Sequence, residues 1–184
     1  MPPVLDVTAG TWMFDATVFY NLEAAHFTVP IMHIGRRGRI AAEVANEIRS
    51  TSGGGYDPVP WGWCVLELEG ASQLQRYAGL LRRWSATGRE HRGEAASIAL
   101  ALEAPLDAPI TFVTDDGVAL RACESEGVTA TCTPQLLVGC ARAGWVAAND
   151  AFTAYEAMRA ARRRFVVASE LSRRDFLRLC GAVQ

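Results

Sequence analysis

Apolar and polar positions follow one another along this chain in blocks that predict strands alternating with helices. The apolar run Thr11–Phe14 is typical of a strand, and after it Val18, Leu22 and Ala25 recur at helical spacing over residues 17–26. Further apolar segments predict strands at 63–69, 108–114 and 128–132. Periodic patterns predict further helices at 40–50 (after a short apolar entry), 71–84, 93–104, 118–127, 134–144, 150–164 and 169–179.

This order predicts an α/β fold, because strands joined through helices of ten or more residues pair in parallel and need helices on both faces of the sheet. We expect a three-layer α/β/α sandwich with a mostly parallel central sheet and extra C-terminal helices. Residues 1–150 would form the main domain, and residues 151–184 a helical extension. The extension carries Phe176, Leu177 and Leu179 at helical spacing, so it would pack on the domain, on a partner or in a homodimer.

The amino-acid composition favours a globular domain and argues against disulfide-rich, zinc-binding and membrane proteins. Half of the 184 residues are hydrophobic, enough for one domain with a sizeable core. The five cysteines show no Cys-x-x-Cys spacing, so neither a disulfide framework nor a zinc site is indicated. No apolar run reaches the roughly 18 residues that span a bilayer, and no signal-peptide pattern is present, so we expect a cytoplasmic protein with no membrane association.

The net charge and the arginine clusters point in different directions on nucleic-acid binding. The formal net charge of −2 argues against a protein that coats nucleic acid through bulk positive charge. All 18 basic residues are arginine, and their clusters have two readings, solvated helix faces or local phosphate contacts. The clusters are Arg36 with Arg37 and Arg39, Arg82 with Arg83, Arg89 with Arg92, Arg162–Arg164, and Arg173 with Arg174.

Acidic residues end two of the predicted strands. Asp15 follows the first strand, and Asp115 and Asp116 follow the strand at 108–114. The carboxyl ends of parallel strands meet at one edge of the sheet, so these carboxylates would converge if the two strands are neighbours. Each also has a simpler reading: Asp15 as a helix N-cap, and the Asp115–Asp116 pair as a turn completed by Gly117.

Glu94 and Glu47, each on a predicted helix, could join this group. The simpler readings are a favourable charge in a helix's first turn for Glu94 and an exposed helix face for Glu47 and for Glu43 one turn earlier. Four carboxylates brought together repel one another and lose hydration, so such a cluster is costly unless cations lie among them. Mg²⁺ or Mn²⁺ suits oxygen ligands of this kind.

Four segments in order resemble the motifs of PIN-domain proteins. "MFDATVFYNL" is similar to the opening strand, Asp and helix of that family, and "AAEVANEI" to its second acidic motif. "GEAASIALALE" is similar to the third motif, and "TFVTDDGVALRACESEGVTATCTPQLL" to the fourth with the strand and helix after it. The match extends over roughly residues 11–143. It is most like a bacterial PIN subgroup described as predicted nucleic-acid-binding proteins, related to VapC-type toxin ribonucleases.

The resemblance implies a catalytic and metal-binding site of four acids, with Thr17 supporting the first by a hydrogen bond. Glu43 competes with Glu47 for the second position, and Asp115 with Asp116 for the fourth. The four implied acids are Asp15, Glu47, Glu94 and Asp116. The implied activity is Mg²⁺- or Mn²⁺-dependent hydrolysis of RNA phosphodiesters, in the manner of a toxin held by an antitoxin protein. The alternative is a catalytically weak or inactive module of the same fold that binds RNA or a protein.

Other enzyme classes fit the sequence less well. A haloacid-dehalogenase-type phosphatase needs a second Asp two residues after the first, where this chain has Thr17. A dinucleotide-binding fold needs a glycine-rich turn after the first strand, and none is present. The three histidines, His26, His33 and His91, lie near no nucleophile motif, so we expect them to be structural or exposed.

Overall fold

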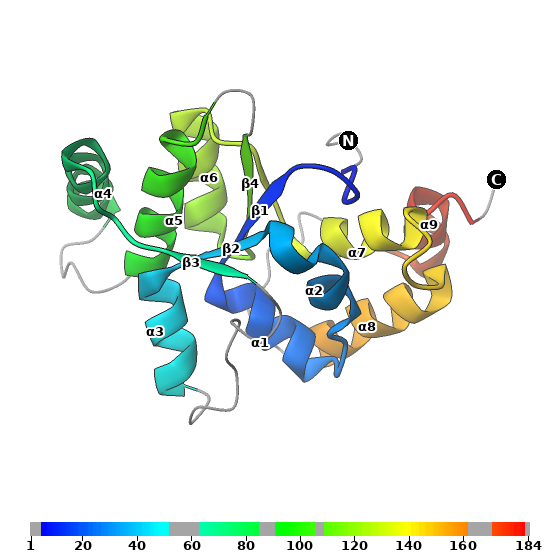
Figure 1. Ribbon diagram of the computed structural model, residues 1–184. Coiled ribbons are helices and arrows are strands. Elements are labelled where there is room, and N and C mark those ends of the chain that lie inside the picture. Colours follow the sequence, from blue (N-terminus) through cyan, green and yellow to red (C-terminus); the bar gives the residue numbers. More distant parts are fainter. Residues whose placement is uncertain (1–4, 52–62, 85–90, 106–108, 162–170, 183–184) are drawn as a thin grey trace.

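The computed structural model describes residues 5–51, 63–84, 91–105, 109–161 and 171–182. In this part of the chain, five strands form one central sheet in which all neighbouring strands run parallel (Figure 1). The strand order is β3-β2-β1-β4-β5. The strands are β1 (Thr11–Phe14), β2 (Gly38–Ala41), β3 (Cys64–Leu66), β4 (Ile110–Val113) and β5 (Ala130–Thr131).

Helices cover both faces of this sheet. They are α1 (Ala16–Ala24), α2 (Val29–Ile34), α3 (Ala42–Thr51), α4 (Ala71–Trp84), α5 (Arg92–Leu102), α6 (Gly117–Glu126), α7 (Thr133–Arg142), α8 (Ala148–Ala160) and α9 (Arg173–Leu179), with a 3-10 helix at Gly35–Arg37. Helix α5 crosses one face, where it contacts β1, β2 and β4 and lies beside α4 and α6. Helices α1, α7 and α8 pack together on the other face (Figure 1). The predicted three-layer α/β/α architecture is confirmed.

Two elements differ from the sequence prediction. The short apolar entry to the helix at 40–50 is strand β2, which pairs with β1 and runs directly into α3. Four residues are too few to show a strand periodicity of their own, so the helical pattern that follows dominated the prediction. Helix α2 was not predicted, and Pro30 occupies its first turn, where a missing N–H costs little. The predicted helical residues 162–164 and 169–170 lie outside the described residues, as does most of the glycine-rich loop after Thr51.

Burial on both faces explains the uninterrupted apolar run of β1. Trp12, Met13 and Phe14 are all buried. The ring of Phe14 lies 4.5 Å, centroid to centroid, from the indole of Trp63. Trp63 also covers Gly38, where an added Cβ atom would lie only 2.4 Å from the indole ring. Only glycine therefore fits at the start of β2, and this contact seats β2 against the central strand.

The C-terminal helices α8 and α9 pack against the rest of the described chain. Tyr155 of α8 and Phe176 of α9 are fully buried, with stacked rings 5.4 Å apart, and both belong to the same hydrophobic core as the sheet. Helix α8 begins at Ala148, so the predicted boundary at residue 150 falls inside it, and the division into two units stays a prediction. Among the described helices, none has both the length and the apolar run needed to cross a membrane.

Replacing Phe176 by alanine is expected to lower the free energy of unfolding by about 3–5 kcal/mol, because the lost ring leaves a cavity against Tyr155 and Phe152. Urea unfolding followed by circular dichroism measures this change. Arg174→Ala, on the exposed side of the same helix, is the control and should change stability by less than about 0.5 kcal/mol. Equal stability of Phe176→Ala and wild type would show that α9 does not complete the core.

The centre of the sheet contains the point where the chain changes direction. From β1 the chain adds β2 and β3 on one side, and then returns to add β4 and β5 on the other. Strands β1 and β4 are therefore neighbours from distant parts of the sequence, with Phe14 opposite Val113. In open α/β sheets, ligands bind beyond the carboxyl ends of the strands at such a switch point. Asp15 and the segment Thr114–Asp116 lie at this switch point, directly after β1 and β4.

Candidate functional site

Asp15 lies at the end of β1 and begins α1. It is buried, and one carboxylate oxygen accepts a hydrogen bond from the N–H of Ala16 at 2.8 Å, so this residue is the N-cap of the helix. Its other oxygen, Oδ2, accepts hydrogen bonds from the hydroxyls of Thr17 at 2.6 Å and Thr114 at 2.9 Å. The simple N-cap interpretation is therefore correct as far as it goes, but capping uses only one of the two oxygens. The predicted support of Asp15 by Thr17 is confirmed.

The two threonine hydroxyls also connect Asp15 to the neighbouring strand end. The oxygen of Thr17 accepts a hydrogen bond from the backbone N–H of Asp115 at 3.2 Å, and that of Thr114 accepts one from the N–H of Asp116 at 3.1 Å. The ends of β1 and β4 thus share one hydrogen-bond network. This network fixes the distance and orientation between Asp15 and the two following aspartates.

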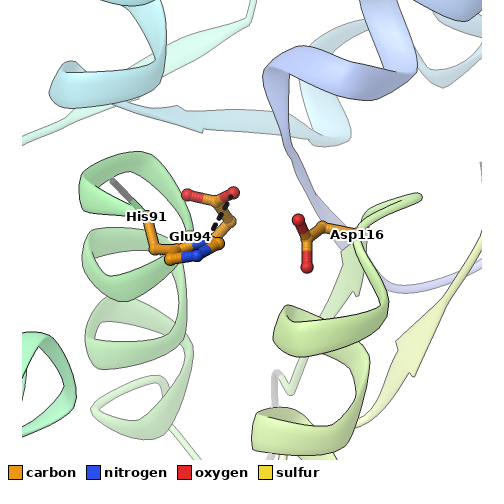
Figure 2. A group of neighbouring side chains, drawn as sticks. All are labelled: His91, Glu94 and Asp116. Atoms are coloured by element: carbon orange, nitrogen blue, oxygen red, sulfur yellow. Dashed lines mark ion pairs between the residues drawn. The ribbon is translucent and has the colours of Figure 1, made fainter. Parts of the chain in front are cut away.

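Asp116 begins α6 in the same way that Asp15 begins α1. Its Oδ1 accepts hydrogen bonds from the N–H groups of Val118 at 2.6 Å and Ala119 at 3.1 Å. The side chain is only partly buried, and its carboxylate faces the start of α5 across a short gap (Figure 2). Capping by Oδ1 leaves Oδ2 available to a ligand in that gap.

Glu94 and His91 lie on the other side of this gap, at the start of α5 (Figure 2). Nδ1 of His91 is 3.5 Å from Oε1 of Glu94. One ligand atom each from His91, Glu94 and Asp116 lies within 4.8 Å of the other two. Donors on opposite sides of a single divalent cation are roughly 4 to 5 Å apart, since each oxygen binds at about 2.0–2.6 Å. These three side chains are therefore spaced as the ligands of one metal ion would be.

Asp115 is surrounded by hydrogen-bond donors and does not belong to the group formed by His91, Glu94 and Asp116. Its carboxylate accepts hydrogen bonds from the Asn21 side chain at 2.6 Å, from the Thr133 backbone N–H at 2.8 Å and from the Thr133 hydroxyl. It is buried, and it ties α1 and the start of α7 to the end of β4. The carboxylate of Asp115 is as fully hydrogen-bonded as that of Asp15, and the difference between Asp115 and Asp116 is that Asp116 lies within ligand distance of Glu94 and His91.

Glu47 and Glu43 occupy successive turns of α3 but have different neighbours. If a Cβ atom were added at Gly93, the residue before Glu94, it would lie 3.6 Å from a carboxylate oxygen of Glu47. The side chain of Glu47 is more exposed than that of Glu43, yet partial loss of hydration and the charge on Asp15 raise the pKa of Glu47 above its usual value. The pKa of Tyr77, by contrast, is raised mainly by burial of its phenol and further by the charge on Glu43. Glu47 therefore lies at the rim of the acidic group, and Glu43 lies toward α4.

Burial and mutual repulsion disfavour the charged forms of these acids. Burial raises the pKa of Asp15 despite its three hydrogen bonds, and the charge on Asp116 adds to the effect. The pKa of Glu94 is raised to about 7, first by burial and then by the charge on Asp15, with His91 acting in the opposite direction. Burial also raises the pKa of Asp115. A bound divalent cation would reverse these shifts, because it stabilises the charged carboxylates.

The arginine clusters are not all close to this site. Arg36, Arg37 and Arg39 lie at the start of β2, at the opposite edge of the parallel sheet from Asp15. Arg83, at the end of α4, forms an ion pair with Glu126 at the end of α6. Arg92 lies within the first turn of α5, next to His91. Of these arginines, Arg92 is the one nearest the acidic group along the chain.

Four residues of this network were missed by the sequence analysis. Asn21, Thr114 and Thr133 support the aspartates through contacts that a single sequence does not show, because most join residues far apart along the chain. His91 was expected to be structural or exposed, but it lies beside Glu94. Its position three residues before Glu94, at the start of a strongly periodic helix, was the one available signal.

No protein-family model matches the chain, and searches of curated proteins and of solved structures found no match. The resemblance to PIN domains therefore stays an interpretation of the sequence motifs. The geometry of the acidic group supports the site independently of that resemblance.

Proposed function

We propose that this protein is a metal-dependent ribonuclease whose acidic site binds Mg²⁺ or Mn²⁺ between the ends of β1 and β4 and the start of α5. The observation that carries the proposal is the closeness of Glu94 and Asp116 at the switch point of the sheet, beside the strand end that holds Asp15, whose charge acts on both Glu94 and Glu47. The order of these acids along the chain matches the order of the PIN motifs. RNA as the substrate is inferred from that resemblance.

The donor set suits a hard divalent cation. Carboxylate oxygens are the preferred ligands of Mg²⁺ and Mn²⁺, and both ions commonly keep several waters when few protein ligands are available. Asp15 and Asp116 each use one oxygen as a helix cap, which holds the carboxylate in a fixed orientation. When bound, the ion would activate water and stabilise the negative charge that develops on the phosphate.

The protein's own groups have separate roles in this proposal. Thr17 and Thr114 hold Asp15 in place through its Oδ2, so the carboxylate does not need to reorganise when a ligand binds. Glu94, whose pKa is raised to about 7 in the metal-free protein, would be held as the charged carboxylate by a bound cation and would serve as one of its ligands. Asp115 orients the end of β4 through Asn21 and Thr133.

The proposal extends to partners and location. A protein of this type would act in the cytoplasm, with no membrane association, and an antitoxin protein or a second copy of the chain would be its macromolecular partners. The alternative function is an inactive or weakly active module that binds RNA or a protein through the same fold. RNA binding by the wild-type protein without detectable cleavage would favour that alternative.

Cleavage of mixed RNA and DNA oligonucleotides in Mg²⁺, in Mn²⁺ and in EDTA tests the proposal. We expect RNA cleavage that requires the metal. Glu47→Gln should lower the rate by roughly tenfold, the smaller loss typical of outer groups around a metal site, while the matched change Glu43→Gln one turn away leaves it unchanged. Equal rates for the two variants would remove Glu47 from the site, and cleavage that survives EDTA would contradict the proposed chemistry.

A further inference from the structure

The position of His91 is not explained by the local structure of α5. His91 precedes the helix with a left-handed backbone (φ 67°), and its side chain makes no capping hydrogen bond. Asp15 and Asp116, by contrast, cap their helices with a side-chain oxygen. The imidazole is therefore free of a capping role.

The surroundings of the ring direct it toward the acids. Trp84, at the end of α4, meets the imidazole edge-on, with ring centroids 5.9 Å apart and an interplanar angle of 85°. The ring is mostly covered, with 20% of the side chain exposed. On its other side are Glu94 and, across the gap, Asp116 (Figure 2). The tryptophan thus limits the motion of the ring and leaves a nitrogen facing two carboxylates.

We propose that His91 is a nitrogen ligand of the divalent cation, completing a His91–Glu94–Asp116 triad, and that it makes the site prefer Mn²⁺ over Mg²⁺. The 4.8 Å limit on the separations of the three ligand atoms carries this inference. Imidazole is a ligand of first-row transition metals, above all Zn²⁺, Cu²⁺, Fe²⁺ and Ni²⁺, whereas Mg²⁺ is bound almost entirely through oxygen. Of the two cations proposed for this site, Mn²⁺ is the first-row transition metal and accepts a nitrogen ligand more readily. The inference rests on the function proposed above, because it assigns a further ligand to the same cation.

The competing explanation is that His91 only pairs with Glu94. The 3.5 Å separation of Nδ1 and Oε1 is compatible with an ion pair between a protonated imidazole and the carboxylate. The two explanations differ in one observable. A ligand nitrogen is bonded to the metal, and an ion-paired imidazolium is not.

Electron spin-echo spectroscopy of bound Mn²⁺ detects a coordinated nitrogen directly, without any activity measurement. The samples are tag-free wild type, His91→Asn and His26→Asn, loaded with Mn²⁺ in a buffer without nitrogen ligands. Asparagine tolerates the left-handed backbone at position 91. His26 also has a positive φ (50°) but lies outside the triad, so His26→Asn controls for the same substitution in the same kind of backbone position.

We expect ¹⁴N modulation in wild type and in His26→Asn, and none in His91→Asn. Calorimetry should show that His91→Asn binds Mn²⁺ at least about tenfold more weakly, a loss seen even for outer groups of metal sites, with a smaller change for Mg²⁺. Bound Mn²⁺ without ¹⁴N modulation in wild type would overturn the role of His91 and leave the acidic site standing. The same holds if the modulation persists in His91→Asn. Absence of Mn²⁺ binding to wild type would overturn both proposals.

Discussion

Asp15→Asn is expected to abolish most RNA cleavage while making the metal-free protein more stable. A metal ion contributes several kcal/mol of charge stabilisation, and each 1.4 kcal/mol is a factor of ten in rate. Removing one negatively charged ligand should therefore lower the rate by more than about a hundredfold. Asparagine caps helices about as well as aspartate, so α1 should keep its start.

The stability gain follows from the environment of Asp15. Burial outweighs its hydrogen bonds and raises its pKa, so the folded protein disfavours the charge that asparagine lacks. Relief of one strongly repelling carboxylate pair is worth about 1 kcal/mol. Thermal melts in EDTA measure this gain, and single-turnover cleavage in Mg²⁺ measures the rate.

Asp150→Asn is the matched control for Asp15→Asn, because Asp150 is an exposed acid in the first turn of α8. It should change neither the rate nor the melt in EDTA appreciably. If Asp15→Asn kept full activity and the wild-type melting temperature, Asp15 would be a helix cap and nothing more. The proposed cation site would then lack its first ligand, and the case for a ribonuclease would be weaker.

Glu94→Gln is expected to remove a large pH dependence of stability in metal-free protein. The folded-state pKa of Glu94 is about 7, above its ordinary value of 4.5, so in this pH window the folded protein holds a proton that the unfolded chain has released. The folded state therefore loses stability as the pH rises from about 4.5 to 7, and the loss is complete above pH 7. A pKa difference of this size corresponds to at most about 3 kcal/mol.

Urea unfolding of wild type and Glu94→Gln in EDTA, at several pH values between 4.5 and 8.5, tests this prediction. Glutamine should leave stability unchanged at the acid end and raise it progressively toward pH 8. Saturating Mg²⁺ should reduce the difference, because the ion stabilises the charged carboxylate of the wild type. Asp150→Asn, at an exposed acid in the first turn of α8, is the control. Parallel profiles for wild type and Glu94→Gln would show that Glu94 carries no unfavourable charge.

The sequence could predict the layers of this fold because its strongest signals are local. The buried run Thr11–Phe14 and the helix at 71–84 follow from periodicity alone, and Asp15 and Asp116 are visible as polar residues at strand ends. Strand β2 was missed because its four residues merge with α3. The sequence does not show that β1 and β4 are neighbours, and the structure pairs them in parallel.

The details of the site could not be predicted, since they depend on contacts between distant residues. Asn21 reaches Asp115 across 94 positions, and Thr114 reaches Asp15 across 99. Glu43 and Glu47 lie on the same side of α3 one turn apart, so the choice between them depends on which turn of α3 lies beside the start of α5. His91 was expected to be structural or exposed, because no local pattern shows that its ring meets Trp84 and faces Glu94.

Calorimetric titration of Mg²⁺ into tag-free wild type, Asp15→Asn and Asp116→Asn tests most directly whether the acids from β1, β4 and α5 form one cation site. Both substituted residues begin helices, where asparagine replaces aspartate with little loss of capping. We predict saturable binding to wild type that either substitution weakens by at least about tenfold. Wild type that binds no Mg²⁺, or binding that neither substitution changes, would contradict the account.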